Sequence, residues 1–425
     1  MRVLAIALLA LTASARADEY NYQNLLVGTR SSGMGGADVA FADSVTGAYY
    51  NPAGIVDAEA RLVSVDLKAY RLDLAGFTDV KVAEGMAGRA SGLRLSSFPL
   101  NFGLITRLGS AGGFDDHTLA FNFFAEDSEI GGARIDVRIP GIADLYLRVR
   151  QRDHETLRAG PAWAARRGDF SFGAALAYRV RVESLLVDSL VDIQDNITYR
   201  LSDIEAVQGS LVAELATVWR PLQGLRIGAT LTAPGLRLHG TAVSSEVDLR
   251  SGVMPAYEVP SELPMQARTP WKGALGVGYQ WASGIRVAAD ASVYAPIHRY
   301  EVIPGLLEAE GRWTVTWNAG ASVPLSRKLV LRGGAFGNPA TSPKPPPDQV
   351  PDMFDDPTRL PHVDYYGATL GGTMHAGKSS LDVSLVYQYG TGQTPAETSR
   401  GYDPVRSQVI LFMLGGTYTF IEGGP

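Results

Sequence analysis

The chain has 425 residues, carries no cysteine and has a formal net charge of −6. The acidic balance argues against a nucleic-acid partner, because phosphate binding needs a basic face. The missing cysteines exclude disulfides and thiolate metal sites, and a mean hydropathy of +0.01 is too polar for a bundle of membrane-spanning helices.

Residues 1–17 have the pattern of a secretory signal. Arg2 supplies the positive charge, Val3 to Ala13 form a short apolar stretch, and Ala15-Arg16-Ala17 matches a small-residue cleavage site. The apolar stretch is too short for a membrane anchor helix. We therefore predict that this signal is cleaved and that the mature chain begins at Asp18.

Residues 18–60 form a glycine-dense segment ahead of the first long strand pattern. The segment contains Gly33-Met34-Gly35-Gly36 and closes on Tyr49-Tyr50-Asn51-Pro52-Ala53-Gly54. The glycine spacing is not that of a nucleotide-binding loop, and no strand precedes it. Because glycine permits close backbone approach, we interpret the segment as a plug folded inside a tube. Asn51-Pro52 alone would indicate only a turn.

Residues 61–425 repeat a pattern in which apolar residues alternate with small or polar ones. In the clearest example, Trp271, Leu275 and Trp281 share one strand face, and Lys272 lies on the other. A tilted strand of this length places the two tryptophans roughly 23 Å apart along a membrane normal, close to the spacing of the aromatic girdles in outer-membrane barrels. Polar residues then face inward and apolar residues face lipid.

These segments predict an all-β membrane fold, an antiparallel outer-membrane β-barrel of about fourteen strands. An even count returns both chain ends to one side, which we expect to be periplasmic. Short turns such as Ala282-Ser283 alternate with long loops, as is typical of these barrels. Division of 143–166 into two strands would break this alternation. The predicted strands are 61–72, 93–108, 117–128, 143–166, 169–183, 206–220, 224–240, 269–281, 284–297, 311–323, 327–338, 364–377, 379–391 and 407–420. The predicted long loops are 73–92, 129–142, 184–205, 241–268, 298–310, 339–363 and 392–406.

The last predicted strand ends in Phe420. This resembles the C-terminal aromatic signal that the barrel-assembly machinery recognises, although Ile421 to Pro425 follow it. We therefore expect that machinery and outer-membrane lipid as partners of a monomer in the outer membrane of a Gram-negative bacterium.

The plug segment also carries a family resemblance. Gly28, Gly33 to Ala37, Ala42-Asp43 and Tyr49 to Gly54 resemble the hatch of the FadL/TodX family of outer-membrane transporters for long-chain fatty acids and hydrophobic compounds. The family fold is a fourteen-stranded barrel with an N-terminal hatch. The resemblance implies that a hydrophobic ligand enters near the extracellular loops, occupies a pocket in the barrel and moves on after a change in the hatch. The implied hatch and gating residues are Gly33, Gly35, Gly36, Asn51, Pro52 and Ala53.

Three arginines are candidates for binding a ligand carboxylate. Arg148 and Arg150 are two residues apart and share a strand face, and Arg179 lies on the next predicted strand. An arginine facing lipid near the membrane centre costs about 2–4 kcal/mol, so these side chains should face the lumen or lie beyond the membrane. They form either a carboxylate site or ion pairs with plug carboxylates such as Asp38 or Asp43.

Other features leave two readings open or carry no signal. Pro99 marks either an opening in the barrel wall or the start of a strand. The histidines show no metal spacing, and no grouping indicates an enzyme or a cofactor. Besides hydrophobic transport, the alternatives are a general porin and a barrel that serves secretion, assembly or adhesion through loops 241–268 and 339–363. A plugged barrel conducts poorly, which argues against a porin.

Overall fold

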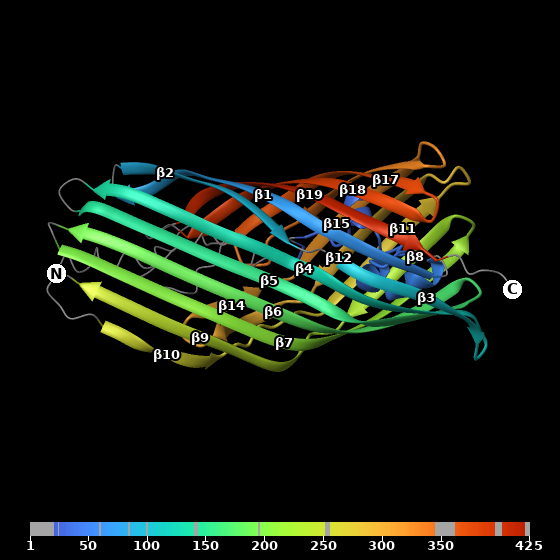
Figure 1. Cartoon of the computed structure of the whole chain (residues 1–425), viewed down its shortest axis with the longest axis horizontal. Helices are drawn as coiled ribbons and strands as arrows, with labels where there is room; N and C mark the ends of the chain where they lie inside the picture. Colours follow the sequence, from blue (N-terminus) through green and yellow to red (C-terminus); the bar gives the residue numbers. More distant parts are fainter. Residues whose placement is uncertain are drawn as a thin grey trace.

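The computed structural model shows an elongated β-barrel that surrounds the N-terminal part of the chain (Figure 1). Among the described residues, no helix has the length and apolarity needed to cross a membrane. The residues that the structure describes are 21–23, 25–58, 61–83, 86–98, 101–139, 143–193, 196–250, 256–344, 362–395 and 402–420.

The barrel is one antiparallel sheet that closes where β19 pairs with β1. Three of its wall positions hold two labelled strands each: β2 and β3 both pair with β1, β8 and β9 both pair with β7, and β10 and β11 pair with β9 and β8. The seventeen strands of the sheet therefore make fourteen wall positions in the described chain, which confirms the predicted count. The strands are β1 (Arg61–Ala83), β2 (Met86–Phe98), β3 (Asn101–Ala111), β4 (Phe114–Ile139), β5 (Ala143–Arg167), β6 (Phe170–Ile193), β7 (Asn196–Leu222), β8 (Leu225–Thr232), β9 (Leu236–Arg250), β10 (Ala256–Pro264), β11 (Lys272–Gln280), β12 (Arg286–Tyr294), β15 (Thr314–Pro324), β16 (Leu329–Asn338), β17 (His362–Ala376), β18 (Ser379–Pro395) and β19 (Tyr402–Thr419).

The wall has the inverted polarity that the alternation predicts. Trp271, Leu275 and Trp281 are exposed on the outer face, whereas Asp290 and Asn318 are buried on the inner face. An apolar outer surface suits hydrocarbon, and polar inner residues find partners in the lumen. The same alternation explains why each side chain points where it does.

Most of the predicted long loops are wrong, because the strands continue through them. Strand β5 is a single strand, and the segments predicted as loops 129–142, 184–205 and 241–268 lie largely in β4, β6, β7, β9 and β10. Ladder hydrogen bonds between neighbouring strands satisfy the backbone beyond the membrane as well as within it. Short turns do join the strands at the other end of the barrel, which we call the turn side.

A hairpin replaces the predicted loop 298–310. Strands β13 (Ile297–Ile303) and β14 (Leu307–Gly311) pair with each other and not with the wall. Val302 and Ile303 are buried and pack in one cluster with Ile204 of β7 and Ala242 of β9. The hairpin therefore folds over the inner face of the barrel and narrows the lumen on the side opposite the turns.

The N-terminal segment, which we define as residues 21–58, fills the lumen near the turn side (Figure 1). It contains α2 (Thr29–Gly33), α3 (Gly47–Tyr50) and the 3₁₀ helix η1 (Pro52–Asp57), and most of its residues are buried. Wall glycines let it approach closely, because a side chain at these positions would collide with it. The contacts from an added Cβ would be 2.0 Å from Gly103 to Val45, 2.2 Å from Gly173 to Ala53 N, 2.2 Å from Gly228 to Val39 O and 2.2 Å from Gly320 to Met34 O.

Candidate functional site

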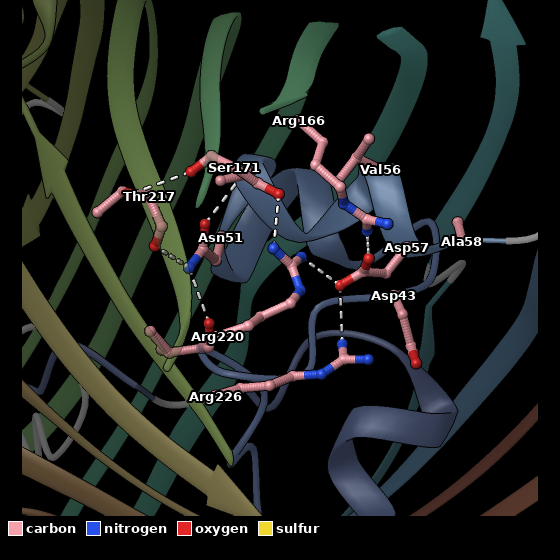
Figure 2. A network of polar contacts seen from close by, with 12 residues as sticks. Asp43, Asn51, Val56, Asp57, Ala58, Arg166, Ser171, Thr217, Arg220 and Arg226 are labelled. Carbon is pink, nitrogen blue, oxygen red and sulfur yellow. Dashed lines mark hydrogen bonds and ion pairs between the residues drawn. The ribbon is translucent and has the colours of Figure 1, made fainter. Parts of the chain in front are cut away.

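The turn side of the N-terminal segment is held by one carboxylate and three arginines (Figure 2). Asp57 ends η1, and its Oδ2 accepts from Arg220 Nη2 at 2.5 Å and from Arg226 Nη1 at 2.8 Å. Arg166 forms an ion pair with the other carboxylate oxygen. These arginines come from the ends of β5, β7 and β8, so a single residue of the N-terminal segment ties three wall strands together. Asp57 is only 8% exposed, which makes the cluster an anchor rather than a surface contact.

A second carboxylate anchors the same side. Asp43 pairs with Arg30 of its own segment at 2.7 Å and with Arg286 of β12 at 2.8 Å. Burial opposes ionisation, but the two arginines prevail and lower the pKa of Asp43 to about 2. The guanidinium groups of Arg226 and Arg286 lie 5.2 and 5.3 Å from the ring centre of Phe41, so both cations also contact this aromatic ring.

Asn51, predicted from the Asn-Pro-Ala pattern, is fully buried and joins the segment to itself and to the wall (Figure 2). Its Nδ2 donates to Val39 O at 2.8 Å and to Thr217 O at 3.2 Å, and its Oδ1 accepts from Ala53 N at 3.0 Å. Pro52 is buried beside it and begins η1. Both N–H groups and the oxygen of the Asn51 amide are thereby used, which accounts for an amide at this place.

The predicted glycines Gly33, Gly35 and Gly36 lie against strands β15 to β17. Gly33 ends α2, and a Cβ there would lie 3.1 Å from the Cα of Gly371. Gly35 and Gly36 have φ values of +67° and +78°, a region that favours glycine. A side chain on Gly35 would also lie 2.8 Å from Ala335 N. These residues let the backbone turn tightly against the wall.

A buried acid, Asp38, lies within the segment itself and has no ion pair among the residues that the structure describes. Asp38 Oδ2 accepts from Ser31 Oγ at 2.6 Å and from Thr46 Oγ1 at 3.5 Å. Burial raises the pKa of Asp38 to about 7, although Arg30 and Arg286 act in the other direction. This carboxyl therefore changes charge near neutral pH.

The other side of the N-terminal segment faces a cavity of about 180 Å³. Its floor contains Tyr22 and Tyr49 from the segment together with Lys272 and Tyr294 from the wall, and Tyr300 of the β13–β14 hairpin lies among its other lining residues. Tyr22 stacks on Tyr294 with ring centres 4.2 Å apart. We call this side of the segment the cavity side.

Charged side chains from the long strands line the cavity wall. Arg158 lies 3.4 Å from Glu214 and 3.5 Å from Glu126, and Arg179 donates to Glu126 at 2.6 Å. Arg179 is thus lumenal, as predicted, but its partner is a wall glutamate and neither Asp38 nor Asp43. Most of these charges compensate each other within the wall.

Other predicted positions are placed only in part. The backbones of Arg148 and Arg150 lie in β5, but their side chains are outside the described residues. Pro99 also lies outside the described residues. The described wall is interrupted elsewhere, at Ala233 to Gly235 between β8 and β9 and at Met265 to Trp271 between β10 and β11.

This wall interruption borders the cavity. Thr232, Ala233 and Thr269 are among the cavity lining residues. Gln208 of β7 bridges the interruption, since its side-chain amide donates to Ala267 O and accepts from Ala267 N, both at 2.7 Å. A side chain here replaces the backbone ladder that would otherwise seal the wall.

The turn side holds a larger chamber of about 500 Å³ beside the segment. Its lining includes Arg30, Asp43 and Arg286, the neighbouring pair of Arg332 and Asp382, and many serine and threonine residues. The chamber is therefore hydrophilic, and its chemistry differs from that expected of a route for an apolar solute.

Several solved structures resemble this chain over nearly its whole length. The chain superimposes on a Pseudomonas aeruginosa FadL homologue with a TM-score of 0.67 at 13% identity, covering 94% of this chain and 100% of that one. It matches the Pseudomonas putida toluene transporter TodX with a TM-score of 0.65 at 13% identity, covering 94% and 100%. The Ralstonia pickettii toluene transporter TbuX gives a TM-score of 0.60 at 15% identity, covering 94% and 99%.

The fold is that of the FadL and TodX channels. No protein-family model matches the chain, and no curated protein sequence matches it. At these low identities the likeness establishes the FadL/TodX-type fold of an outer-membrane β-barrel over nearly the whole chain.

Several residues of the site were not singled out from the sequence. Asp57 and its arginines were missed, because Asp57 is one acid in a short stretch and its partner Arg226 is 169 residues away. Lys272 was noted only as part of the inward face. One signal in the sequence could have found them. Arg220 and Arg226 lie on either side of a predicted short turn, where two arginines can bind an acidic residue at the end of the N-terminal segment.

Proposed function

We propose that the protein carries hydrophobic compounds across the outer membrane by passive diffusion, with the N-terminal segment as a hatch. The observation that carries this proposal is the shared fold with channels named for toluene and monoaromatic hydrocarbons and with a FadL homologue. A plugged barrel with a cavity on one side of the plug supplies a place for a ligand and a barrier to water. Long-chain fatty acids and aromatic hydrocarbons are the two substrate classes to compare.

The two cavities differ in what they offer a departing ligand. An apolar ligand leaving through the hydrophilic chamber would lose favourable contacts, whereas the wall interruption near Ala233 and Thr269 borders the cavity directly. We therefore propose that ligand leaves sideways, through this interruption, toward the membrane. The side-chain bridge from Gln208 is easier to break than a backbone ladder.

A disulfide tests whether the hatch must move. A Cβ built on Gly103 would lie 3.3 Å from Cβ of Val45, close to the separation of roughly 3.5–4.5 Å in a disulfide. The chain has no cysteine of its own, so the double variant Val45→Cys/Gly103→Cys forms one defined bond between hatch and wall.

The measurement is uptake of labelled long-chain fatty acid and labelled toluene by cells that lack their own transporter. We expect wild type to restore uptake, the oxidised double variant to block it, and reductant to recover it, with each single variant as control. Asn51→Ala should alter uptake while the barrel still assembles, as shown by heat-modifiable migration in gels. Absence of uptake by a correctly assembled wild-type barrel would refute transport, and full uptake by the locked barrel would refute hatch movement.

A further inference from the structure

A third and much smaller cavity lies beneath the tyrosine floor of the 180 Å³ cavity. It measures about 20 Å³, and its lining includes Tyr50, Lys272 and Asp290. A space of this size holds about one water molecule when polar groups surround it. Lys272, Tyr49 and Tyr294 line both this space and the 180 Å³ cavity above it, which we call the large cavity to distinguish it from this one. These side chains therefore lie between the two spaces.

Asp290 connects this space to the N-terminal segment. The residue is 6% exposed, and its Oδ2 accepts from the backbone N–H of Val39 at 2.8 Å. Its Oδ1 has no hydrogen-bond partner among the residues that the structure describes. Gly276 lies opposite Asp290 in the ladder, and the lack of a side chain there leaves room around that oxygen.

Lys272 supplies the positive charge on the other side of the space. Its ammonium lies 5.6 Å from the ring centre of Tyr49 and 5.9 Å from that of Tyr294. Within the described chain no carboxylate lies within ion-pair distance of it. Lys272 pairs with Tyr294 in the ladder, two inward positions from Asp290, so its flexible side chain can serve either cavity.

The electrostatics of this arrangement couple the two cavities. A buried carboxylate keeps its charge only when a cation or hydrogen bonds compensate for burial. A hydrogen bond from Val39 N–H to an ionised carboxylate is roughly twice as strong as one to a neutral acceptor. Lys272 lines the same small space as Asp290 and adds to the compensation that the backbone N–H of Val39 gives to this carboxylate, so the hold on the segment at Val39 weakens when the ammonium moves away.

We propose that Lys272 is a positioning residue that links the occupant of the large cavity to the hatch. An anionic head group in the large cavity draws the ammonium upward, the charge on Asp290 loses its compensation, and the hydrogen bond to Val39 weakens. This inference rests on the proposed transport function for its ligand, but the link between Lys272 and Val39 is a property of the protein alone. On this proposal, an amphiphile with an anionic head group weakens the hydrogen bond between Asp290 and Val39, whereas a neutral hydrocarbon does not.

Hydrogen–deuterium exchange of the Val39 amide in the purified full-length protein tests the link without any ligand. Lys272→Met removes the charge at similar length, Lys272→Arg keeps it, and Asp290→Asn keeps an acceptor without charge. We expect exchange at Val39 to accelerate on the order of tenfold in Lys272→Met and Asp290→Asn. Lys272→Arg should remain near wild type, and the double variant should add nothing to either single one.

The Ala53 amide, which bonds to Asn51, is the internal control and should exchange at the wild-type rate throughout. Equal acceleration at Ala53 and Val39 would indicate general loosening and overturn the proposal. Unchanged exchange at Val39 in Lys272→Met would overturn it as well.

The ligand step uses dodecanoate, with 1-dodecanol as the neutral molecule of equal chain length. Dodecanoate should accelerate exchange at Val39 in wild type and in Lys272→Arg but not in Lys272→Met, and 1-dodecanol should have no such effect. Acceleration by both compounds would overturn the role of the anionic group. If the exchange results hold and cellular uptake is absent, the transport function fails while the link stands.

Discussion

The two sides of the N-terminal segment meet the barrel through different chemistry. On the turn side, Asp43 and Asp57 bind five arginines, four of them on wall strands. On the cavity side, Tyr22 stacks on Tyr294, and Tyr49 lies near the charges of Lys272 and Arg158. One side is held by buried ion pairs. The other is held by aromatic contacts and by hydrogen bonds from the Asn21 amide to the wall.

The difference indicates which side yields first. Breaking a buried ion pair leaves an uncompensated charge and costs about 3–5 kcal/mol. Separating an aromatic pair or a cation from a ring costs about 0.5–2 kcal/mol. Opening is therefore expected to begin at the cavity side, with the turn side as a fixed hinge.

The largest effect should come from removing the turn-side anchor. Asp57→Ala leaves three arginines facing one another and should weaken docking of the segment by about 3–5 kcal/mol. Ala37 is 0% exposed, so a cysteine at this position is labelled only when the segment undocks. Weaker docking should therefore appear as faster thiol labelling at a given urea concentration.

The matched control is Glu262→Ala, which removes an exposed carboxylate outside the cluster. If labelling in Asp57→Ala stays as slow as in the control, the Asp57 cluster does not hold the segment. The proposed difference between the two sides would then be wrong.

A smaller effect should follow from adding a side chain at a wall glycine that the N-terminal segment packs against. In Gly173→Ala the new Cβ would lie 2.2 Å from Ala53 N, and such overpacking costs about 1–3 kcal/mol. Gly273→Ala adds the same group where nothing lies within 4 Å. Urea-dependent labelling of the Ala37→Cys reporter should separate the two variants. Equal behaviour would mean that the segment is not wedged against β6.

The smallest effect concerns pH. Asp38 has a pKa of about 7 in the folded protein and 3.8 as its ordinary value, so the folded state binds the extra proton between them. The resulting stability is complete below pH 3.8 and is lost as pH rises through 7. Between pH 6 and 8 the docked segment should weaken by about 1 kcal/mol.

Asp38→Asn should reduce this pH dependence, because the amide cannot titrate. Asp43 has its pKa lowered to about 2 and stays ionised over the same interval, so it contributes no slope. Thiol labelling of the Ala37 reporter across this pH range is the measurement. A slope in Asp38→Asn equal to that of wild type would assign the titration to another group.

The sequence predicted the barrel because lipid and lumen impose opposite polarity on alternate residues. Trp271 and Asp290 show both halves of that rule, and the strand count followed from it. Beyond the membrane neither face meets lipid, so polarity no longer marks a strand. That is why 129–142 and 184–205 were predicted as loops although both continue the sheet.

The site was predicted less fully than the fold. The glycines stood out because they permit tight backbone geometry, and Asn51 stood out through the resemblance of its motif to the FadL/TodX hatch. The ion pairs did not, because each joins residues far apart in the chain, as with Asp57 and Arg220 at a separation of 163. The sequence left Arg179 either in the lumen or beyond the membrane, and its partner Glu126 depends on how β4 and β6 flank β5.

Strands β4 to β7 have 26, 25, 24 and 27 residues, and together they form a tall extension of the wall on one side of the barrel (Figure 1). A tilted strand of this length rises roughly 58 Å, whereas the apolar band of such a barrel is about 25 Å high. More than half of that height stands in water, away from the turn side. A scarce, poorly soluble molecule thus meets protein well before it meets lipid. The extended strands therefore enlarge the protein surface that such a molecule can reach by diffusion.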